Sequence, residues 1–218
     1  MSPKIHEFYR MQGFWNERYE NEVAAYGKEP NAFLASTLSA LKPSRPEHPH
    51  LLLPCDGEGR NAVWAAKNGW KTSSFDYSQR GVEKARQWAR QAQVQVNAKV
   101  ADAFVYTPEE EADVVGLIFA HMEATKRAEF HTRAVSWVRP GGHIVLEGFH
   151  PNQIHNDRLS GGPKKLNMMF TQEMLRSDFE MQGQMEILSL ETVQTHLSEG
   201  PFHQGPADVI RMRARKRR

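Results

Sequence analysis

The sequence predicts an α/β protein with a doubly wound, mostly parallel sheet. Two observations predict this fold class. Short apolar segments alternate with helical segments between residues 50 and 149, which is the order that gives parallel strands joined by helices. The apolar run Leu51–Leu53 is followed by the turn Gly57-Glu58-Gly59 and by a helical pattern from Asn61. This strand, glycine turn and helix are typical of sites that bind nucleotide-type cofactors.

The other strands follow in order along the chain. They are expected at residues 71–75, 94–100, 113–119 and 143–149. A helix at about 125–137 precedes the last of them, and Pro140-Gly141-Gly142 forms the turn into it. Residues 185–195 and 207–214 flank a Gly/Pro-rich connection and are interpreted as the antiparallel pair that ends the sheet.

The chemistry of the glycine turn separates two cofactors. Glycines let the backbone approach a ligand closely, and Asp76, at the end of the second strand, is placed to accept hydrogen bonds from ribose hydroxyls. Ala62 occupies the third glycine position of a dinucleotide motif, so the glycines alone do not exclude NAD. Asp56 and Glu58 would repel a pyrophosphate but suit a cation. They favour S-adenosylmethionine.

With these elements in place, the chain resembles the class I S-adenosylmethionine-dependent methyltransferases. Residues 57–59 resemble motif I, Asp76 the ribose acid, residues 101–103 the adenine-side motif, and residues 140–142 the turn before strand five. The resemblance implies a Rossmann-like methyltransferase fold with seven strands, of which the last is antiparallel. Motif I departs from its usual form, because Leu53 replaces the acid that commonly ends strand one and Cys55 replaces the first glycine.

More specific segments resemble the tellurite-resistance and thiopurine methyltransferase group and its small uncharacterised bacterial relatives. The segments are the aromatic spacing Trp15, Tyr19 and Tyr26, and residues 57–62, 146–149, 161–164 and 199–205. This resemblance implies methyl transfer to a small acceptor: a thiol, a chalcogen oxyanion or a small hydroxyl compound. A non-catalytic protein that binds S-adenosylmethionine or its product is the alternative, and a nicotinamide oxidoreductase is a third.

The resemblance also implies a set of site residues. Those expected to bind the cofactor are Trp15, Tyr26, Asn31, Cys55, Asp56, Gly57, Glu58, Gly59, Asn61, Asp76, Tyr77, Ser78, Asp102, Ala103, Phe104 and Ala120. His121, just past strand four, is either a substrate-facing base or a loop residue bonded to backbone. Glu147 and His150 could line the acceptor pocket, although Glu147 is equally suited to be a cross-strand partner.

The chain is expected to form a single domain over residues 1–218. Residues 1–42 form a helical lid, residues 50–149 the cofactor-binding core, and residues 150–218 the substrate-side insertion and the C-terminal strand pair. Aromatic residues of the lid could close over a sulfonium cofactor and exclude water. The alternative is that Trp15 and Tyr19 make ordinary core contacts.

Composition limits the partners. The net charge is +2, and six basic residues lie at 211–218, where they alternate with apolar ones as on a half-buried strand. We therefore expect no nucleic-acid partner. No apolar run is long enough to span a membrane, the histidines show no metal-ligand spacing, and the one cysteine fits a reducing, cytoplasmic compartment. Cys55 is expected to be a packing residue, and the oligomeric state is open.

Overall fold

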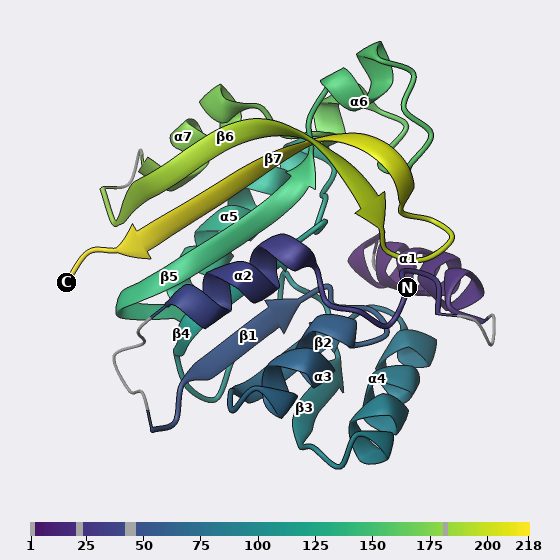
Figure 1. Cartoon of the computed structure of the whole chain (residues 1–218), viewed down its shortest axis with the longest axis vertical. Coiled ribbons are helices and arrows are strands. Elements are labelled where there is room, and N and C mark those ends of the chain that lie inside the picture. Colours follow the sequence, from purple (N-terminus) through teal and green to yellow (C-terminus); the bar gives the residue numbers. More distant parts are fainter. Residues whose placement is uncertain (1–2, 21–23, 42–46, 181–182) are drawn as a thin grey trace.

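The computed structural model describes residues 3–20, 24–41, 47–180 and 183–218. Its centre is a seven-stranded sheet in the order β3-β2-β1-β4-β5-β7-β6, with helices on both faces (Figure 1). β7 is antiparallel to both of its neighbours, and the other adjacent pairs are parallel. The predicted fold class is confirmed.

The strands are β1 (His50–Pro54), β2 (Lys71–Asp76), β3 (Val96–Val100), β4 (Ala112–Ile118), β5 (Val138–Phe149), β6 (Met185–Ser198) and β7 (Gln204–Lys216). The helices are α1 (Pro3–Arg18), α2 (Ala32–Ala40), α3 (Arg60–Lys67), α4 (Gln79–Gln91), α5 (Ala124–Trp137), α6 (Asn152–His155) and α7 (Gln172–Glu180), with a 3-10 helix, η1, at Leu166–Met168. Within these ranges no helix is long and apolar enough to cross a membrane.

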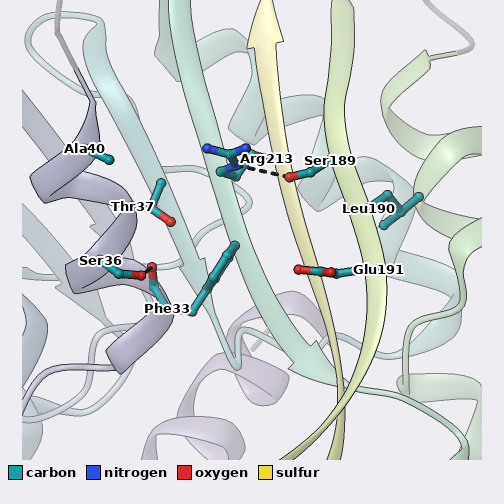
Figure 2. Close-up of a pocket in the computed structure, with 8 residues that line it drawn as sticks. All are labelled: Phe33, Ser36, Thr37, Ala40, Ser189, Leu190, Glu191 and Arg213. Atoms are coloured by element: carbon teal, nitrogen blue, oxygen red, sulfur yellow. Dashed lines mark hydrogen bonds between the residues drawn. The ribbon is translucent and has the colours of Figure 1, made fainter.

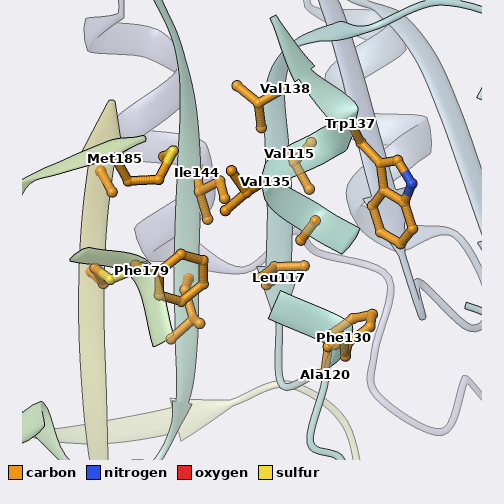
Figure 3. Close-up of a cluster of buried hydrophobic side chains, with 14 of the residues drawn as sticks. Val115, Leu117, Ala120, Phe130, Val135, Trp137, Val138, Ile144, Phe179 and Met185 are labelled. Atoms are coloured by element: carbon orange, nitrogen blue, oxygen red, sulfur yellow. The ribbon is translucent and has the colours of Figure 1, made fainter. Parts of the chain in front are cut away.

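The core lies on both faces of the sheet. On one face Phe130 and Trp137 of α5 and Phe179 of α7 pack against Val115 and Ile144 of the central strands (Figure 3). On the other face, leucines of α2 and alanines of α3 cover β1 and β4. Burial on both faces explains why β1 is a continuous apolar run rather than an alternating one.

The boundary of β5 differs from the prediction. The strand begins at Val138 instead of residue 143, and the expected turn at 140–142 is an irregularity inside it. The register with β4 shifts between Ala112 and Val114, and Gly141 has a φ of +80°. A bulge lets the strand continue through a sequence that would otherwise end it.

Candidate active site

The glycine turn and the end of β2 meet at the carboxyl edge of the sheet. The Gly57 amide donates to Asp76 Oδ2 at 3.0 Å, and the Ser78 amide donates to Asp76 Oδ1 at 2.8 Å. Ser78 also caps α4 by accepting from the Gly81 amide at 3.0 Å. β1 and β2 are adjacent and parallel, so both end at this edge. The structure thus brings together the turn and the acid that the sequence predicted.

The two glycines of the turn allow close packing within the protein. Gly57 has a φ of +55°, and a Cβ there would lie 2.4 Å from the hydroxyl of Tyr19. Gly59 has a φ of +80°, and its Cβ would lie 2.4 Å from the Cβ of Ala85 on α4. Both conditions exclude a side chain. Gly59 therefore sets the distance between α4 and the start of α3. Gly57 sets the distance to the N-terminal leader, the segment 1–42 that is predicted to be the lid.

Two carboxyl groups at this edge have raised pKa values. Burial raises the pKa of Asp76 to about 6 and that of Asp56 to about 7. Asp56 accepts from Asn61 Nδ2 at 2.9 Å and from the Ala62 amide at 3.2 Å, so it caps the start of α3. Neither carboxyl forms an ion pair in the part of the chain that the structure describes. The charge of Arg60 lowers the pKa of Asp56, but Arg60 forms its ion pair with Glu199. Carboxyls without a bonded cation fit a ligand that brings positive charge and hydroxyl donors.

Glu58 is engaged by the protein itself. Its Oε2 accepts from the Ala25 amide and its Oε1 from Lys84 Nζ, both at 2.8 Å. The side chain is buried, and its two hydrogen bonds connect the glycine turn to the leader and to α4. The structure gives Glu58 a structural role, and direct contact with the cofactor stays a prediction.

Cys55, between β1 and the turn, has a φ of +57°. Burial and the neighbouring carboxylates, Asp76 first, raise the pKa of its thiol well above the ordinary value. A protonated thiol that packs against the core agrees with the packing role predicted from the sequence.

The leader lies over the turn and the ribose acid. Gln12 Nε2 donates to the Tyr77 carbonyl at 3.0 Å, and Asn16 Oδ1 accepts from Ser78 Oγ at 2.8 Å. Tyr19 is buried, and its ring stacks on Trp15 with centroids 5.8 Å apart. Sequence reasoning placed the aromatic residues here but missed Gln12 and Asn16, since polar residues on a helix carry no periodic signal.

Asn31 is the centre of a buried polar network. Its Oδ1 accepts from the Leu34 amide at 2.9 Å, which caps α2, and its own amide donates to Asn61 Oδ1 at 2.9 Å. Its Nδ2 donates to Glu147 Oε1 at 2.6 Å and to Glu199 Oε1 at 3.0 Å. Asn31 therefore connects the leader, α3, β5 and the residue just past β6.

Glu147 and His150, the two residues considered for the acceptor pocket, make contacts within the protein. Glu147 pairs with Arg211, directly opposite on β7, which is the cross-strand role expected as an alternative. His150 Nδ1 accepts from the Asn152 amide at 3.2 Å at the start of the insertion.

The predicted adenine-side residues gather after β3. Asp102 Oδ1 accepts from the Tyr77 hydroxyl and from the Phe104 amide, each at 2.8 Å. Ala103 and Ala120 are buried in the core beneath. The remaining oxygen of Asp102 accepts no hydrogen bond from the described residues, which leaves it available to a donor.

His121 follows β4 and is held by the backbone at both ring nitrogens. Nδ1 lies 2.8 Å from the Met168 carbonyl and Nε2 lies 3.0 Å from the Phe149 amide. Nδ1 therefore carries the proton and Nε2 accepts. The ring is stacked between Phe149 and Phe170, and burial lowers the pKa of His121 to about 4. With no free nitrogen, His121 fits the backbone-bonded alternative and not the base.

This pKa predicts a loss of stability in mild acid. The unfolded chain binds the His121 proton near pH 6.5, whereas the folded chain does so only near pH 4. The folded state binds fewer protons between these values, so stability falls as the pH falls. We expect His121 to contribute a loss on the order of 2 kcal/mol between pH 7 and pH 5. Denaturant titrations measure the free energy of unfolding at each pH, and this free energy should depend less on pH in His121→Gln than in wild type. An equal pH dependence in the two proteins would contradict the lowered pKa of His121.

A groove of about 390 Å³ lies elsewhere, between α2 and the β6–β7 pair (Figure 2). It is lined by Phe33, Ser36, Thr37, Ala40, Ser189, Leu190, Glu191 and Arg213. None of the predicted site residues lines it. The carboxyl edge, where the turn, the acids and the leader meet, is therefore the better candidate for the active site.

The comparisons with known proteins agree with this placement. A family model described as a methyltransferase domain matches residues 53–142, from the end of β1 into β5. This match confirms the predicted class of enzyme, a methyltransferase, and agrees with S-adenosylmethionine as the predicted cofactor. No curated protein matches the chain.

Solved structures share the whole fold at low identity. A protein from work on conversion of a disulfide bond into a thioacetal group during echinomycin biosynthesis has a TM-score of 0.75 and 18% identity, over 95% of this chain and 92% of that one. TehB from Haemophilus influenzae has a TM-score of 0.66 and 13% identity, over 95% of this chain and 67% of that one. The N-methyltransferase NodS from Bradyrhizobium japonicum, in complex with S-adenosyl-L-homocysteine, has a TM-score of 0.65 and 14% identity, over 94% of this chain and 98% of that one. These matches support the fold, and the tellurite-resistance or thiopurine subgroup stays a prediction.

Proposed function

We propose that this protein transfers a methyl group from S-adenosylmethionine to a small-molecule acceptor. The observation that carries the proposal is the pair of carboxyls, Asp56 and Asp76, that lie beside the glycine turn without ion-pair partners in the described chain. The bound cofactor supplies an activated methyl group on a sulfonium, and the residues of the chain hold and orient it.

Asp76 would accept hydrogen bonds from the ribose hydroxyls. Its oxygens already accept from Gly57 and Ser78, which fixes the carboxylate while leaving further lone pairs free. Asp102, with one oxygen free of described partners, would accept from the adenine amino group. Asp56 supplies negative charge near the cationic end.

The leader would act as the lid. Tyr19 and Trp15 lie over the turn, and Gln12 and Asn16 attach α1 to the residues just after Asp76. Aromatic faces stabilise a sulfonium, and a closed leader excludes water from the methyl transfer.

We expect cofactor binding to slow amide hydrogen exchange in residues 10–20. The ligand would lie beneath this segment and stabilise its closed position. Exchange measured with and without S-adenosyl-L-homocysteine checks this, with α5 on the opposite face of the sheet as the internal control. Equal protection of residues 10–20 in both states would show that the leader is only scaffold.

The acceptor would enter between the leader and the insertion at 151–170. The arginines of β7 face Ser189, Glu186 and Glu147 instead of forming a positive surface at the carboxyl edge. This arrangement favours a small acceptor over a nucleic acid. Among the described residues no group of His, Cys, Asp or Glu could hold a metal ion, so no metal is assigned. The free cysteine is compatible with the proposed cytoplasmic location.

A methyl-acceptor screen tests the function. The chain is incubated with methyl-labelled S-adenosylmethionine and separate panels of thiols, chalcogen oxyanions and small hydroxyl compounds. Turnover of one panel supports the proposal. Tight cofactor binding without turnover of any panel would favour the alternative, a protein that binds the cofactor without catalysis. Methylation of tRNA, DNA or a folded protein alone would contradict a small acceptor.

A further inference from the structure

A second histidine at the carboxyl edge has the geometry that His121 lacks. His203 lies in the turn between β6 and β7, and its Nδ1 is 3.4 Å from Glu199 Oε2. Nε2 forms no hydrogen bond with the described residues, and this atom is not completely buried. Nε2 therefore keeps access to solvent. A carboxylate that holds the Nδ1 proton leaves Nε2 as the basic nitrogen.

Glu199 is itself fixed by two other groups. Arg60 donates to its Oε2 at 2.7 Å, and Asn31 donates to its Oε1 at 3.0 Å. Arg60 is the first residue of α3, immediately after the glycine turn. The pair of His203 and Glu199, called the dyad below, is thereby connected to the glycine turn through Arg60 and to the leader through Asn31.

The surroundings of His203 are the elements proposed to enclose the acceptor. Its ring contacts Tyr26 of the leader, with centroids 4.6 Å apart, and Phe119, just past β4, at 4.4 Å. It also lies 5.3 Å from Phe149 at the end of β5. A Cβ added to Gly161 of the insertion would lie 3.3 Å from Nε2. The β6–β7 turn approaches α1 in Figure 1, and Arg18 lies 4.0 Å above the ring of Phe202.

We propose that His203 is the general base for the acceptor and that Glu199 is its positioning residue. The inference rests on the proposed function and narrows its acceptor to a protic group, above all a hydroxyl. The O–H bond of the acceptor breaks, and its proton passes to Nε2. The electron pair left on oxygen forms the bond to the methyl carbon, and the pair of the broken carbon–sulfur bond stays on sulfur.

The charges around His203 are compatible with this role. Burial lowers its pKa, Glu199 raises it, and Arg60 and Arg18 lower it. Tyr26 and His121 are the other titratable groups nearby. A net lowered pKa keeps the imidazole neutral, and so able to accept a proton, at pH 7.

The kinetic test compares His203→Gln with His196→Gln, a matched change of an exposed histidine on β6. The probes are catechol, which must lose a proton, and 4-nitrothiophenol, which is ionised at pH 7. We expect His203→Gln to lower kcat for catechol by about 10²–10⁴-fold and to change the thiolate reaction less than about tenfold. His196→Gln should change neither. Equal losses of kcat on both probes would overturn the assignment of His203 as the base. Methylation of the thiolate alone by wild type would overturn it as well.

A measurement without turnover tests the dyad separately. Nitrogen NMR of the histidine rings in the cofactor-free protein should show the proton of His203 on Nδ1. In Glu199→Gln the pKa of His203 should fall, because the carboxylate that raises it is gone. The Nε2–H form in wild type would overturn the inference even if methyl transfer is found. Failure of wild type on every panel of the acceptor screen would contradict the proposed function, while the Nδ1–H form would still support the dyad.

Discussion

Replacing Asp76 with Asn should weaken binding of S-adenosyl-L-homocysteine by about 1.5–3 kcal/mol, roughly 10- to 150-fold in Kd. The carboxylate is buried, is fixed by two backbone amides and forms no ion pair in the described chain. Asn keeps one acceptor oxygen but loses the charge that strengthens bonds from ribose hydroxyls. Calorimetry measures the loss. Asp157→Asn, at an exposed position, is the matched control and should bind as wild type does.

The same residue predicts how cofactor affinity depends on pH. Burial raises the pKa of Asp76 to about 6, so below that pH the carboxyl is mostly protonated and accepts fewer hydrogen bonds. Affinity should rise between pH 5 and pH 8 in wild type and rise less in Asp76→Asn. Unchanged affinity in a variant that is folded by circular dichroism would show that Asp76 does not hold the ribose.

Gly59→Ala should destabilise the fold by about 2–5 kcal/mol. A non-glycine residue in the left-handed region costs about 1–2 kcal/mol, and overpacking adds about 1–3 kcal/mol. Overpacking follows because the new Cβ would lie 2.4 Å from Ala85 Cβ and 2.9 Å from Ala85 Cα. Denaturant unfolding measures the change.

Gly69→Ala provides the matched control for this change. Gly69 has a φ of +86°, close to that of Gly59, but nothing lies within 4 Å of its added Cβ. It should lose only the backbone term of about 1–2 kcal/mol. Equal losses at the two positions would mean that the contact between α3 and α4 yields freely, and that Gly59 does not set it.

The sheet could be predicted because its signals are local. The apolar run of β1, the turn after it and Asp76 at the end of β2 each specify their element without long-range information. The start of β5 could not be predicted, because Pro140 and Gly141 indicate a turn, and only pairing with β4 carries the strand through them.

The candidate site was predictable in part for a related reason. Residues on adjacent strand ends, such as Gly57 and Asp76, meet whenever the sheet forms. The charge of Glu58 indicated a cofactor contact, but its partners, Ala25 and Lys84, come from distant segments. The sequence indicates His121 as the candidate base, because it follows strand four, and does not single out His203. They differ in whether a ring nitrogen is free, which depends on the insertion and on the β6–β7 turn.

Calorimetric titration of the wild-type chain with S-adenosylmethionine, S-adenosyl-L-homocysteine and NAD tests the central claim most directly. The carboxyls beside the glycine turn should favour the cationic cofactor and its product and disfavour a pyrophosphate. Saturable binding of both sulfur compounds is expected, with no measurable binding of NAD under the same conditions. Tighter binding of NAD than of S-adenosylmethionine would contradict the assignment of the site.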